Sequence, residues 1–472
     1  MRMLFYKEWL ALKRDSRLLS LVLSLIVLFV AVSTITHYQS ERSLEEKKIA
    51  EQAMRAQWEH QGDKHPHRGA HLGVYVFAPE SSLSAFDPGI NHHTGEALWL
   101  EPHKRNMMRF VEGNDNAISN SFGEFTPAFI LISILPLLII GMTFNAISLE
   151  KESGTLRMLR GAGQNPYDVV FAKFAMQLLA ITVLLLVAIS PMLLVVLIKS
   201  DTILWEAILQ GFVLFLAYVL YCTVFIAIGL VISTYASSSR QALMALVGIW
   251  VLFVLIVPRI AATTANVSVS LPSATQFWET IQRDYQNGLP GDGNYTMRMS
   301  RFESDLLQKY KAETLDDLPV GVHALKRIHQ EEYSNKVHEV HFNELWDKYI
   351  RQEELVRGFS ALSPTVVIRL LSMKLSATDL THRRHFEEQA EIYRRYYVKH
   401  VDAWDANHSK GLTSYGSRYG NDALWQSVEG FTYRQPDFGF VLRNATQEIG
   451  YLSVWVCMSI ILLLLSVRRI YA

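Results

Sequence analysis

Long apolar runs without any Asp, Glu, Lys or Arg are the dominant pattern along the chain. Six such runs occur, each of roughly 18 to 33 residues, which is long enough for a helix to cross a hydrocarbon core of about 30 Å. The runs are Leu18–Tyr38, Phe125–Leu149, Phe174–Ile198, Ala207–Ser239, Gln241–Pro258 and Ile449–Val467. Buried helices of a large soluble protein would explain one such run but not six. The pattern therefore predicts an all-α integral membrane protein with six transmembrane helices.

Two long polar segments, residues 39–124 and residues 259–448, hold more than half of the chain. The second contains stripes such as Phe342, Trp346 and Tyr349, spaced as on one face of a helix. We interpret such stripes as core faces of a large, mainly helical domain; a substrate groove is the alternative.

A further apolar stripe lies within the second polar segment, at Leu362–Leu375, where Val366 and Leu370 stand beside Arg369 and Lys374. Two interpretations stay open for it. The stripe belongs either to a helix resting on the outer leaflet or to the core of the domain.

Lysine and arginine residues close to the spans indicate the orientation, because short cytoplasmic segments are enriched in them. The connection 199–206 has a single lysine. The other flanks carry Arg2, Lys7, Lys13, Arg14, Arg17, Lys151, Arg157, Arg160, Lys173, Arg240, Arg468 and Arg469. The asymmetry predicts that residues 1–17, the connection 150–173 and the tail 468–472 are cytoplasmic, and that both long polar segments are extracytoplasmic.

Composition changes this picture little. Lys+Arg and Asp+Glu balance at 45 each, and we expect no nucleic-acid partner. The only two cysteines, Cys222 and Cys457, lie inside spans, so the polar segments cannot form disulfides. The first span has the basic start of a signal peptide, but its apolar run exceeds the usual core of about 7–15 residues. We therefore interpret it as an uncleaved anchor.

The connection 150–173, which we call the hairpin, has the most informative pattern. Its glycines and capping residues predict a helix, a break, a short helix, a second break and a helix. Gly154 is expected to end the second span, and Ser153 or Thr155 to cap the short helix. The glycines of residues 161–163 are expected to end that short helix.

The short helix is predicted to expose Leu156 and Leu159, which share one face and would need a partner to cover them. After it, Asn165, Pro166 and Asp168 suit the N-cap, first and third positions of a new helix. That helix is longer than the membrane is thick, so its first two turns should project from the membrane.

The residues of the hairpin resemble a known family. Glu150-Lys-Glu152-Ser-Gly-Thr-Leu156, followed by Ala172-Lys173-Phe174, is similar to the intracellular loop of ABC-2 type permeases, although Ala172 replaces that family's glycine. The stretches His65–His71 and Leu362-Ser-Pro364 resemble a subgroup of these type V-like ABC transporter permease subunits. That subgroup has a large extracytoplasmic insert of unknown function.

The resemblance implies that the hairpin docks into a cytoplasmic ABC ATPase subunit and that the membrane is the bacterial cell inner membrane. The implied ATPase-coupling residues are Glu150, Glu152, Gly154, Thr155, Leu156, Leu159, Arg160, Pro166 and Lys173. The chain has no Gly-x4-Gly-Lys-Ser/Thr phosphate loop. We therefore expect no catalytic residue and no cofactor in this chain, with ATP and magnesium bound by the separate ATPase.

Other expected partners are a second permease chain, identical or homologous, and membrane lipids; a periplasmic protein is a further candidate. Before the first span, Phe5, Trp9 and Leu12 alternate with cations, a pattern typical of a helix lying in the membrane interface. A plain cytoplasmic extension of the first span is the alternative. In the resembled family, such a helix also borders the ATPase.

Histidines are the candidate metal ligands. His65, His67 and His71 cluster within seven residues. Hydrogen bonding within the fold explains most such histidines, so we expect no metal site, with this cluster as the first candidate if one exists.

The sequence supports an ATP-driven permease subunit that either exports a substrate or transmits the motion of the ATPase to a periplasmic domain. The alternative is a membrane-anchored extracytoplasmic metal-dependent enzyme or metal-binding protein. That alternative explains the histidines but not the hairpin.

Overall fold

The computed structural model of the chain describes residues 1–107, 125–199, 204–410 and 418–470. The far end of the polar segment 39–124 and part of the connection 199–206 therefore lie outside the described residues.

Among the described residues, six helical stretches are long and apolar enough to cross a membrane, which confirms the all-α membrane class predicted from the uncharged runs. Four of these stretches are single helices: α2 (Ser16–Glu59), α10 (Pro166–Lys199), α11 (Leu204–Tyr235) and α20 (Phe438–Val467). The other two each consist of consecutive shorter helices. The first comprises α6 (Pro127–Phe129), η1 (Ile130–Ile134), α7 (Leu135–Thr143) and α8 (Ser148–Glu152). The second comprises α12 (Ser239–Trp250), η2 (Val251–Ile256) and α13 (Val257–Ser268).

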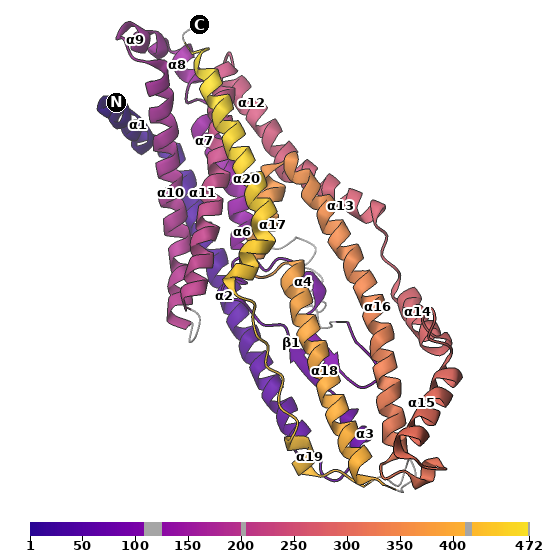
Figure 1. Cartoon of the computed structure of the whole chain (residues 1–472). Coiled ribbons are helices and arrows are strands. Elements are labelled where there is room, and N and C mark those ends of the chain that lie inside the picture. Colours follow the sequence, from indigo (N-terminus) through magenta and orange to yellow (C-terminus); the bar gives the residue numbers. More distant parts are fainter. Residues whose placement is uncertain (108–124, 200–203, 411–417, 471–472) are drawn as a thin grey trace.

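Both chain ends lie toward one end of this bundle, together with the hairpin, and we call it the hairpin end (Figure 1). The first helix, α1 (Arg2–Arg14), and the short hairpin helix, α9 (Thr155–Gly161), are found there. The opposite end carries most of the described residues of the two long polar segments, and we call it the domain end (Figure 1).

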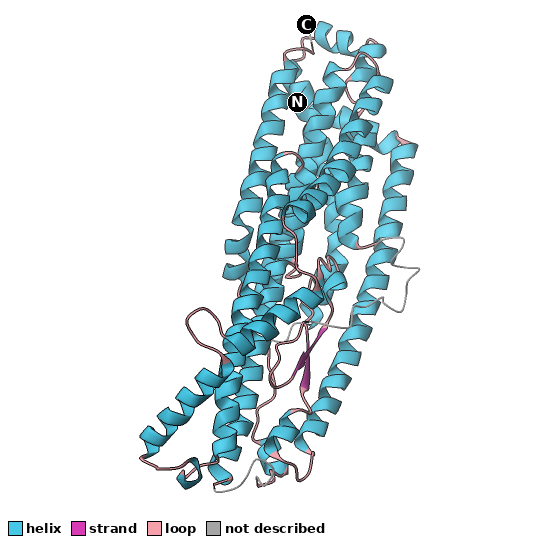
Figure 2. Ribbon diagram, turned by 90° about the vertical axis from the view of Figure 1, so that its right-hand side faces the viewer, coloured by secondary structure: helices cyan, strands magenta, loops and turns pink. Residues whose placement is uncertain are grey.

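The large domain at the domain end is mainly helical (Figure 2). Its helices are α3 (Pro66–Ala70), α4 (Asn91–Thr94), α14 (Ala274–Asn287), α15 (Tyr295–Tyr310), η3 (Leu315–Asp317), α16 (Val322–Gly358), η4 (Phe359–Ala361), α17 (Pro364–Leu375), α18 (Leu380–His408) and α19 (Asp422–Gln426). A two-stranded antiparallel sheet, which the sequence pattern did not predict, pairs β1 (Val74–Phe77) with β2 (Ala97–Leu100).

Helix α2 connects the two ends of the molecule. It is continuous over 44 residues, which corresponds to about 66 Å at 1.5 Å per residue. Figure 1 shows it running from the hairpin end past α10 and α11 and into the large domain, where α19 lies beside its end. There the buried Trp58 donates a hydrogen bond from Nε1 to the Trp425 carbonyl over 3.0 Å. The α2 helix is therefore both a span and a part of the domain core.

Prolines shape two of the spans. A π-helical segment precedes Pro136 and another precedes Pro258, because a proline lacks the N–H that the regular helix would use. The Ile132 carbonyl, four residues before Pro136, accepts a hydrogen bond of 2.8 Å from the buried Tyr221 hydroxyl of α11. Neighbouring helices thus satisfy the backbone that the proline disturbs, as buried membrane helices require.

Helix α17 packs against the domain end of the spans. Its apolar side chains are buried, with Val367 and Ile368 fully so. The Ser372 and Thr365 hydroxyls lie 3.0 and 3.1 Å from the hydroxyls of Tyr218 and Tyr221 on α11. The stripe within Leu362–Leu375 is therefore core, and of the two interpretations left open, the one placing it on the outer leaflet is wrong.

Candidate functional sites

The hairpin has the predicted order of helix, break, short helix, break and helix. Gly154 adopts a left-handed conformation (φ 75°) between α8 and α9, and Gly163 (φ 71°) follows α9. The expected cap was wrong, since neither Ser153 nor Thr155 caps α9 through its side chain. Their hydroxyls lie 2.9 Å from each other, and Gly154 itself occupies the N-cap position. The left-handed turn reverses the chain so tightly that the flanking hydroxyls meet each other.

The start of α10 agrees with the sequence. Pro166 occupies the first helical position, and Asn165 Oδ1 accepts a hydrogen bond of 3.0 Å from the Tyr167 backbone N–H. This capping fixes where α10 begins and so sets the position of Lys173, two turns later.

Lys173 lies in a cluster of four charged side chains that we call the hairpin cluster. Its Nζ lies 2.8 Å from Glu150 Oε1 and 3.0 Å from Glu8 Oε1. Lys7 also pairs with Glu150, and lies 3.2 Å from Glu8. The side chains of Lys173 and Glu150 are only 4% and 13% exposed. Two cations and two anions thus neutralise each other at a site largely shielded from water.

The hairpin cluster joins three elements: α1, the end of α8, and α10. Glu150 and Lys173 were predicted from the sequence, and the structure brings them together. Lys7 and Glu8 were not predicted as part of this site, although their place in the amino-terminal amphipathic pattern was visible. Burial alone would lower the pKa of Lys7, but its pairing with Glu150 and Glu8 outweighs this and raises it above its ordinary value.

Apolar contacts hold α1 in the same place. Leu4 is buried against Val169 and Ala172 of α10, and Leu159 packs onto this group. The Phe5 and Phe171 rings meet edge to face, with centroids 6.2 Å apart.

Of the residues expected to face the membrane interface, Phe5 is half-buried on α10, Leu12 packs on the core of the spans and Trp9 is 52% exposed. The expected stripe is thus divided between α10, the spans and the surface. The interfacial position of α1 stays a prediction.

Glu152 connects the hairpin to a fourth element. Its carboxylate accepts hydrogen bonds from the Ser239 N–H (2.8 Å) and the Ser239 hydroxyl (3.0 Å) at the start of α12. Because a helix N-terminus carries partial positive charge, an anion here stabilises α12. Nearby, the Ser233 hydroxyl accepts hydrogen bonds from the Ile147 and Ser148 N–H groups. The base of the hairpin is therefore fixed to the turn between α11 and α12.

The exposed face of α9 differs from the prediction. Leu156 is 6% exposed and packs into the core of the spans, so the expectation that it is exposed is wrong. Leu159 is partly buried on Leu4. Met158 is 74% exposed instead, and Arg157 and Arg160 are exposed beside it. Helical spacing did identify a shared leucine face, but the chain itself covers that face.

A second buried cluster lies at the domain end, and we call it the domain seam. The Glu448 carboxylate of α20 is fully buried and lies 2.7 Å from Lys374 Nζ of α17 and 2.8 Å from Arg357 Nε of α16. Glu353 supplies a second carboxylate to both cations. Burial alone would lower the pKa of Arg357, but these carboxylates raise it. The domain seam was not predicted from the sequence, because its members lie on three helices that are separated along the chain.

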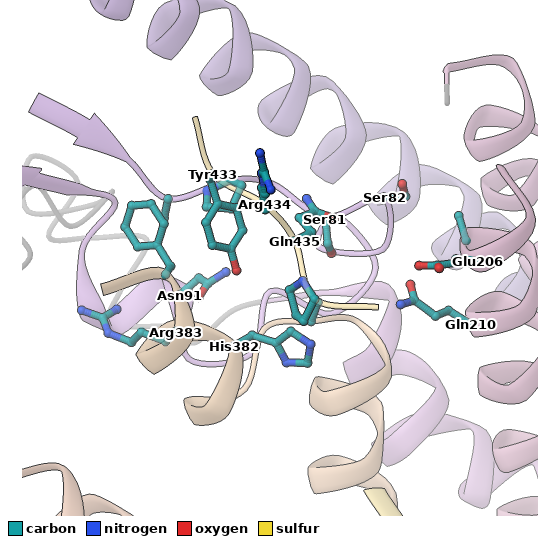
Figure 3. Close-up of a pocket in the computed structure, with 16 residues that line it drawn as sticks. Ser81, Ser82, Asn91, Glu206, Gln210, His382, Arg383, Tyr433, Arg434 and Gln435 are labelled. Atoms are coloured by element: carbon teal, nitrogen blue, oxygen red, sulfur yellow. The ribbon is translucent and has the colours of Figure 1, made fainter. Parts of the chain in front are cut away.

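A cavity of about 500 Å³ lies where the large domain meets the spans (Figure 3). Glu206 and Gln210 line it from the start of α11, and His382 lines it from α18. Arg434 and Tyr433 line it from the segment before α20. Its volume falls within the range of small-molecule sites, and its wall is rich in polar groups.

The candidate metal cluster in the structure has different members from the predicted one. His65 accepts a hydrogen bond from the His67 N–H at Nδ1 (3.2 Å) and so caps α3, which removes it from the predicted group. His103, from the loop after β2, takes its place beside His67 and His71, with ligand nitrogens within 4.8 Å of one another. We call these three residues the histidine trio. His103 was missed because it lies more than 30 residues further along the chain.

Carboxylates hold two members of the histidine trio. His67 Nδ1 lies 3.2 Å from Asp402 of α18, and His103 Nδ1 lies 2.7 Å from Glu331 of α16. Burial alone would raise the pKa of Glu331, but hydrogen bonds from His103 and Arg394 and their charges lower it to about 2. Both carboxylates are almost fully buried, with 1% and 7% of their side chains exposed.

Other histidines of the large domain have protein partners. His341 Nε2 lies 2.9 Å from Asp284, His385 Nδ1 lies 3.0 Å from the Tyr433 hydroxyl, and His382 pairs with Asp379. The expectation of structural hydrogen bonding holds for these side chains.

Comparison with known proteins identifies the family of the chain. The sequence profile described as ABC-2 family transporter protein matches residues 2–468, nearly the whole chain. No curated protein matches it closely enough to count as a relative.

Proposed function

Because the chain belongs to the ABC-2 family of transporter proteins and is a permease subunit of an ABC transporter, we propose that a separate ATPase drives it through the hairpin. In this proposal the hairpin end lies in the cytoplasm, the chain lies in a bacterial inner membrane and the large domain lies outside. A second permease chain, identical or homologous, completes the membrane unit.

The hairpin cluster is the observation that carries the proposal. It binds α1, α8 and α10 to one another through Lys173 and Glu150, and Glu152 adds α12. A force on α9 therefore acts on several spans together, because the elements around it are connected by buried ion pairs and hydrogen bonds. An isolated loop with only exposed contacts would bend instead.

The exposed face of α9 is where we place the ATPase contact. Met158 offers an apolar side chain that is 74% exposed, and Arg157 and Arg160 flank it. An exposed apolar group between cations suits an anchor with a polar rim. Leu156 and Leu159 then act indirectly, by holding α9 on the spans.

Mechanical transmission is the output that the geometry supports best. On α11, the side chains of Tyr218, Tyr221 and Ile226 are fully buried against neighbouring helices. Helix α2 extends continuously from the hairpin end into the large domain, and the domain seam attaches α16 and α17 to α20. Tilting of the spans would therefore move the large domain, which would act on a periplasmic partner.

Export of a substrate is the second candidate, and the cavity at the domain end favours it. Glu206 and Gln210 from a span and His382 from the domain share that cavity. Crosslinking of a transported molecule to a photoreactive side chain at Gln210 would distinguish export from mechanical output.

The test of the proposal is copurification of the ATPase with the double variant Arg157→Glu, Met158→Asp. Loss of an interface anchor commonly costs upwards of about 2 kcal/mol, which weakens binding by more than about tenfold. We expect the variant to fold in the membrane but to lose its ATPase.

The matched control is Met297→Asp, Arg301→Glu, which alters an exposed methionine and an exposed arginine of α15 in the large domain. It should retain the ATPase. Stoichiometric retention of the ATPase by the α9 variant would contradict the proposed docking face.

A further inference from the structure

We infer that the histidine trio is a binding site for a divalent transition-metal ion, with Zn²⁺ as the expected ligand. This inference goes beyond the proposed function and does not depend on it. The site consists of His67 and His71 at α3 and His103 in the loop after β2.

The hydrogen bonds of two imidazoles carry the argument. His67 Nδ1 faces Asp402, and His103 Nδ1 faces Glu331, so each ring places its Nδ1 hydrogen on a carboxylate. In the neutral rings, both Nε2 atoms then carry lone pairs. These two atoms lie 2.9 Å apart and face each other. Two lone pairs at that distance repel, so a cation is needed between them: either a shared proton or a metal ion.

The third histidine favours the metal over the proton. A shared proton needs only two nitrogens, whereas His71 brings a third ligand nitrogen within 4.8 Å of the other two. Zinc binds imidazole nitrogen at about 2.0–2.1 Å in a tetrahedral arrangement, so nitrogens on one ion lie about 3.4 Å apart. Rotation of the exposed His71 ring, with a small widening of the 2.9 Å gap between the His67 and His103 nitrogens, would bring the three nitrogens to that spacing.

The carboxylates supply the arrangement that metal-bound histidines usually have. A carboxylate that accepts the second ring N–H orients the imidazole and raises its basicity. Arg327 Nε lies 3.3 Å from Asp402 Oδ1, and Arg394 Nη1 lies 2.6 Å from Glu331 Oε1. These ion pairs keep both carboxylates in place beside the imidazoles. Asp402 belongs to α18 and Glu331 to α16, so both carboxylates that orient the imidazoles stand on helices.

The backbone at His103 is held in the shape that the site requires. Its φ of 67° is uncommon for a residue with a side chain. Glu331 accepts its backbone N–H at 2.9 Å, and the Ser334 hydroxyl donates to its carbonyl at 3.0 Å. Because both contacts come from α16, the strained residue is anchored to the same helix that orients its ring.

Three imidazoles and an exposed side leave one coordination position for water or for a passing ligand. Imidazole ligands suit Zn²⁺ and Cu²⁺, and affinity normally rises from the earlier divalent metals to Cu²⁺. We therefore expect Cu²⁺ to compete with Zn²⁺ and Mg²⁺ not to bind.

The experiment is titration of the purified full-length protein in detergent with Zn²⁺, followed by metal analysis after gel filtration. The wild type should retain one equivalent, and the variant His67→Ala, His71→Ala, His103→Ala should retain none. A matched triple variant, His323→Ala, His400→Ala, His408→Ala, removes three other histidines of the large domain and should bind like the wild type. Asp402→Asn should bind about 10–100-fold more weakly.

Two further measurements keep the result decisive if the triple variant fails to fold. The single change His71→Ala alters an exposed ring and should still weaken Zn²⁺ binding. Electron paramagnetic resonance of the wild type with one equivalent of Cu²⁺ should show coupling to imidazole nitrogens. Failure of the wild type to retain Zn²⁺ or Cu²⁺, or equal loss in the two triple variants, would overturn the inference and leave a shared proton between His67 and His103.

Discussion

The hairpin cluster and the domain seam are both groups of two cations and two anions, but they differ in contact with water. The hairpin cluster has two lysines and two glutamates, and its Lys7 side chain is 37% exposed. In the domain seam, the fully buried Glu448 is shared by Lys374 and Arg357. Losing Glu448 leaves Lys374, which is only 3% exposed, without its nearest carboxylate at a place that water scarcely reaches, whereas the hairpin cluster is open to water at Lys7.

This difference assigns different mechanical roles to the two ends. A fully desolvated ion pair is costly to break, because the separated charges would lie in a low-dielectric interior. We therefore infer that the domain seam is a permanent joint between the large domain and α20. The hairpin cluster can exchange partners among Lys7, Lys173 and the two glutamates, as a moving joint at the proposed ATPase contact requires.

The largest effect is expected from Glu448→Gln at the domain seam. The change leaves Lys374 and Arg357 facing each other with only Glu353 to offset them, and removal of one member of a buried pair costs about 3–5 kcal/mol. Thermal unfolding in detergent, followed by tryptophan fluorescence, should show a clearly lowered midpoint. Glu429→Gln, at an exposed position of the same domain, should leave the midpoint unchanged. Equal midpoints for the two variants would refute the permanent joint.

A smaller effect is expected from Lys173→Met in the hairpin cluster. Glu8 and Glu150 then keep only Lys7, and we expect a loss of about 2–3 kcal/mol, typical of hydrogen bonds to charged groups. ATP hydrolysis by the bound ATPase should lose its dependence on the permease. Adding Glu8→Gln restores the charge balance and should recover part of the stability; a strictly additive double variant would show that the two residues do not interact.

The pH dependence of stability offers a third test, within the large domain. Burial alone would raise the pKa of Glu391, but Arg394 chiefly, with Arg105 and Arg395, holds it below its ordinary value. The folded pKa lies below the unfolded one, so the contribution to stability is complete above about pH 4.5 and is lost as the pH falls further. Glu391→Gln should cost about 1–2 kcal/mol at pH 7 and flatten the fall in stability below pH 4.5. An unchanged acid profile would exclude this contribution.

The smallest effect is expected from Gly154→Ala at the hairpin. The residue has φ 75°, with nothing within 4 Å of an added Cβ, so only backbone strain opposes the change. We expect a cost of about 1 kcal/mol. Gly161→Ala, also in open space but without a positive φ, should be neutral or slightly stabilising. Comparing the stabilities of the two variants separates the cost of backbone strain at residue 154 from the general effect of replacing a glycine by alanine.

Much of the architecture follows from short-range patterns. The uncharged runs predicted all six spans, because the length of a membrane helix is set by the thickness of the hydrocarbon core. The breaks at Gly154 and Gly163 and the start of α10 at Pro166 were also predicted, since backbone freedom and capping depend on neighbouring residues. Glu150 and Lys173 were selected through the family resemblance and prove to lie 2.8 Å apart.

Other features depend on contacts between residues that are distant in the sequence. The burial of Leu156 was not predictable from its helical spacing, because that spacing identifies a face but not what covers it. His103 replaced His65 because the loop after β2 returns to α3. Glu448, the last residue of the second polar segment, is fully buried because α16 and α17 bring two cations to it.

The sequence by itself therefore determined the membrane class, the number of spans and the local form of the hairpin. Each of these depends on the properties of consecutive residues: apolar length, helix capping and glycine conformation. Only the tertiary structure decided which charges pair, which leucines are covered and which histidines meet. Those outcomes depend on long-range packing, where a charge or an imidazole is placed by helices that lie tens to hundreds of residues apart in the chain.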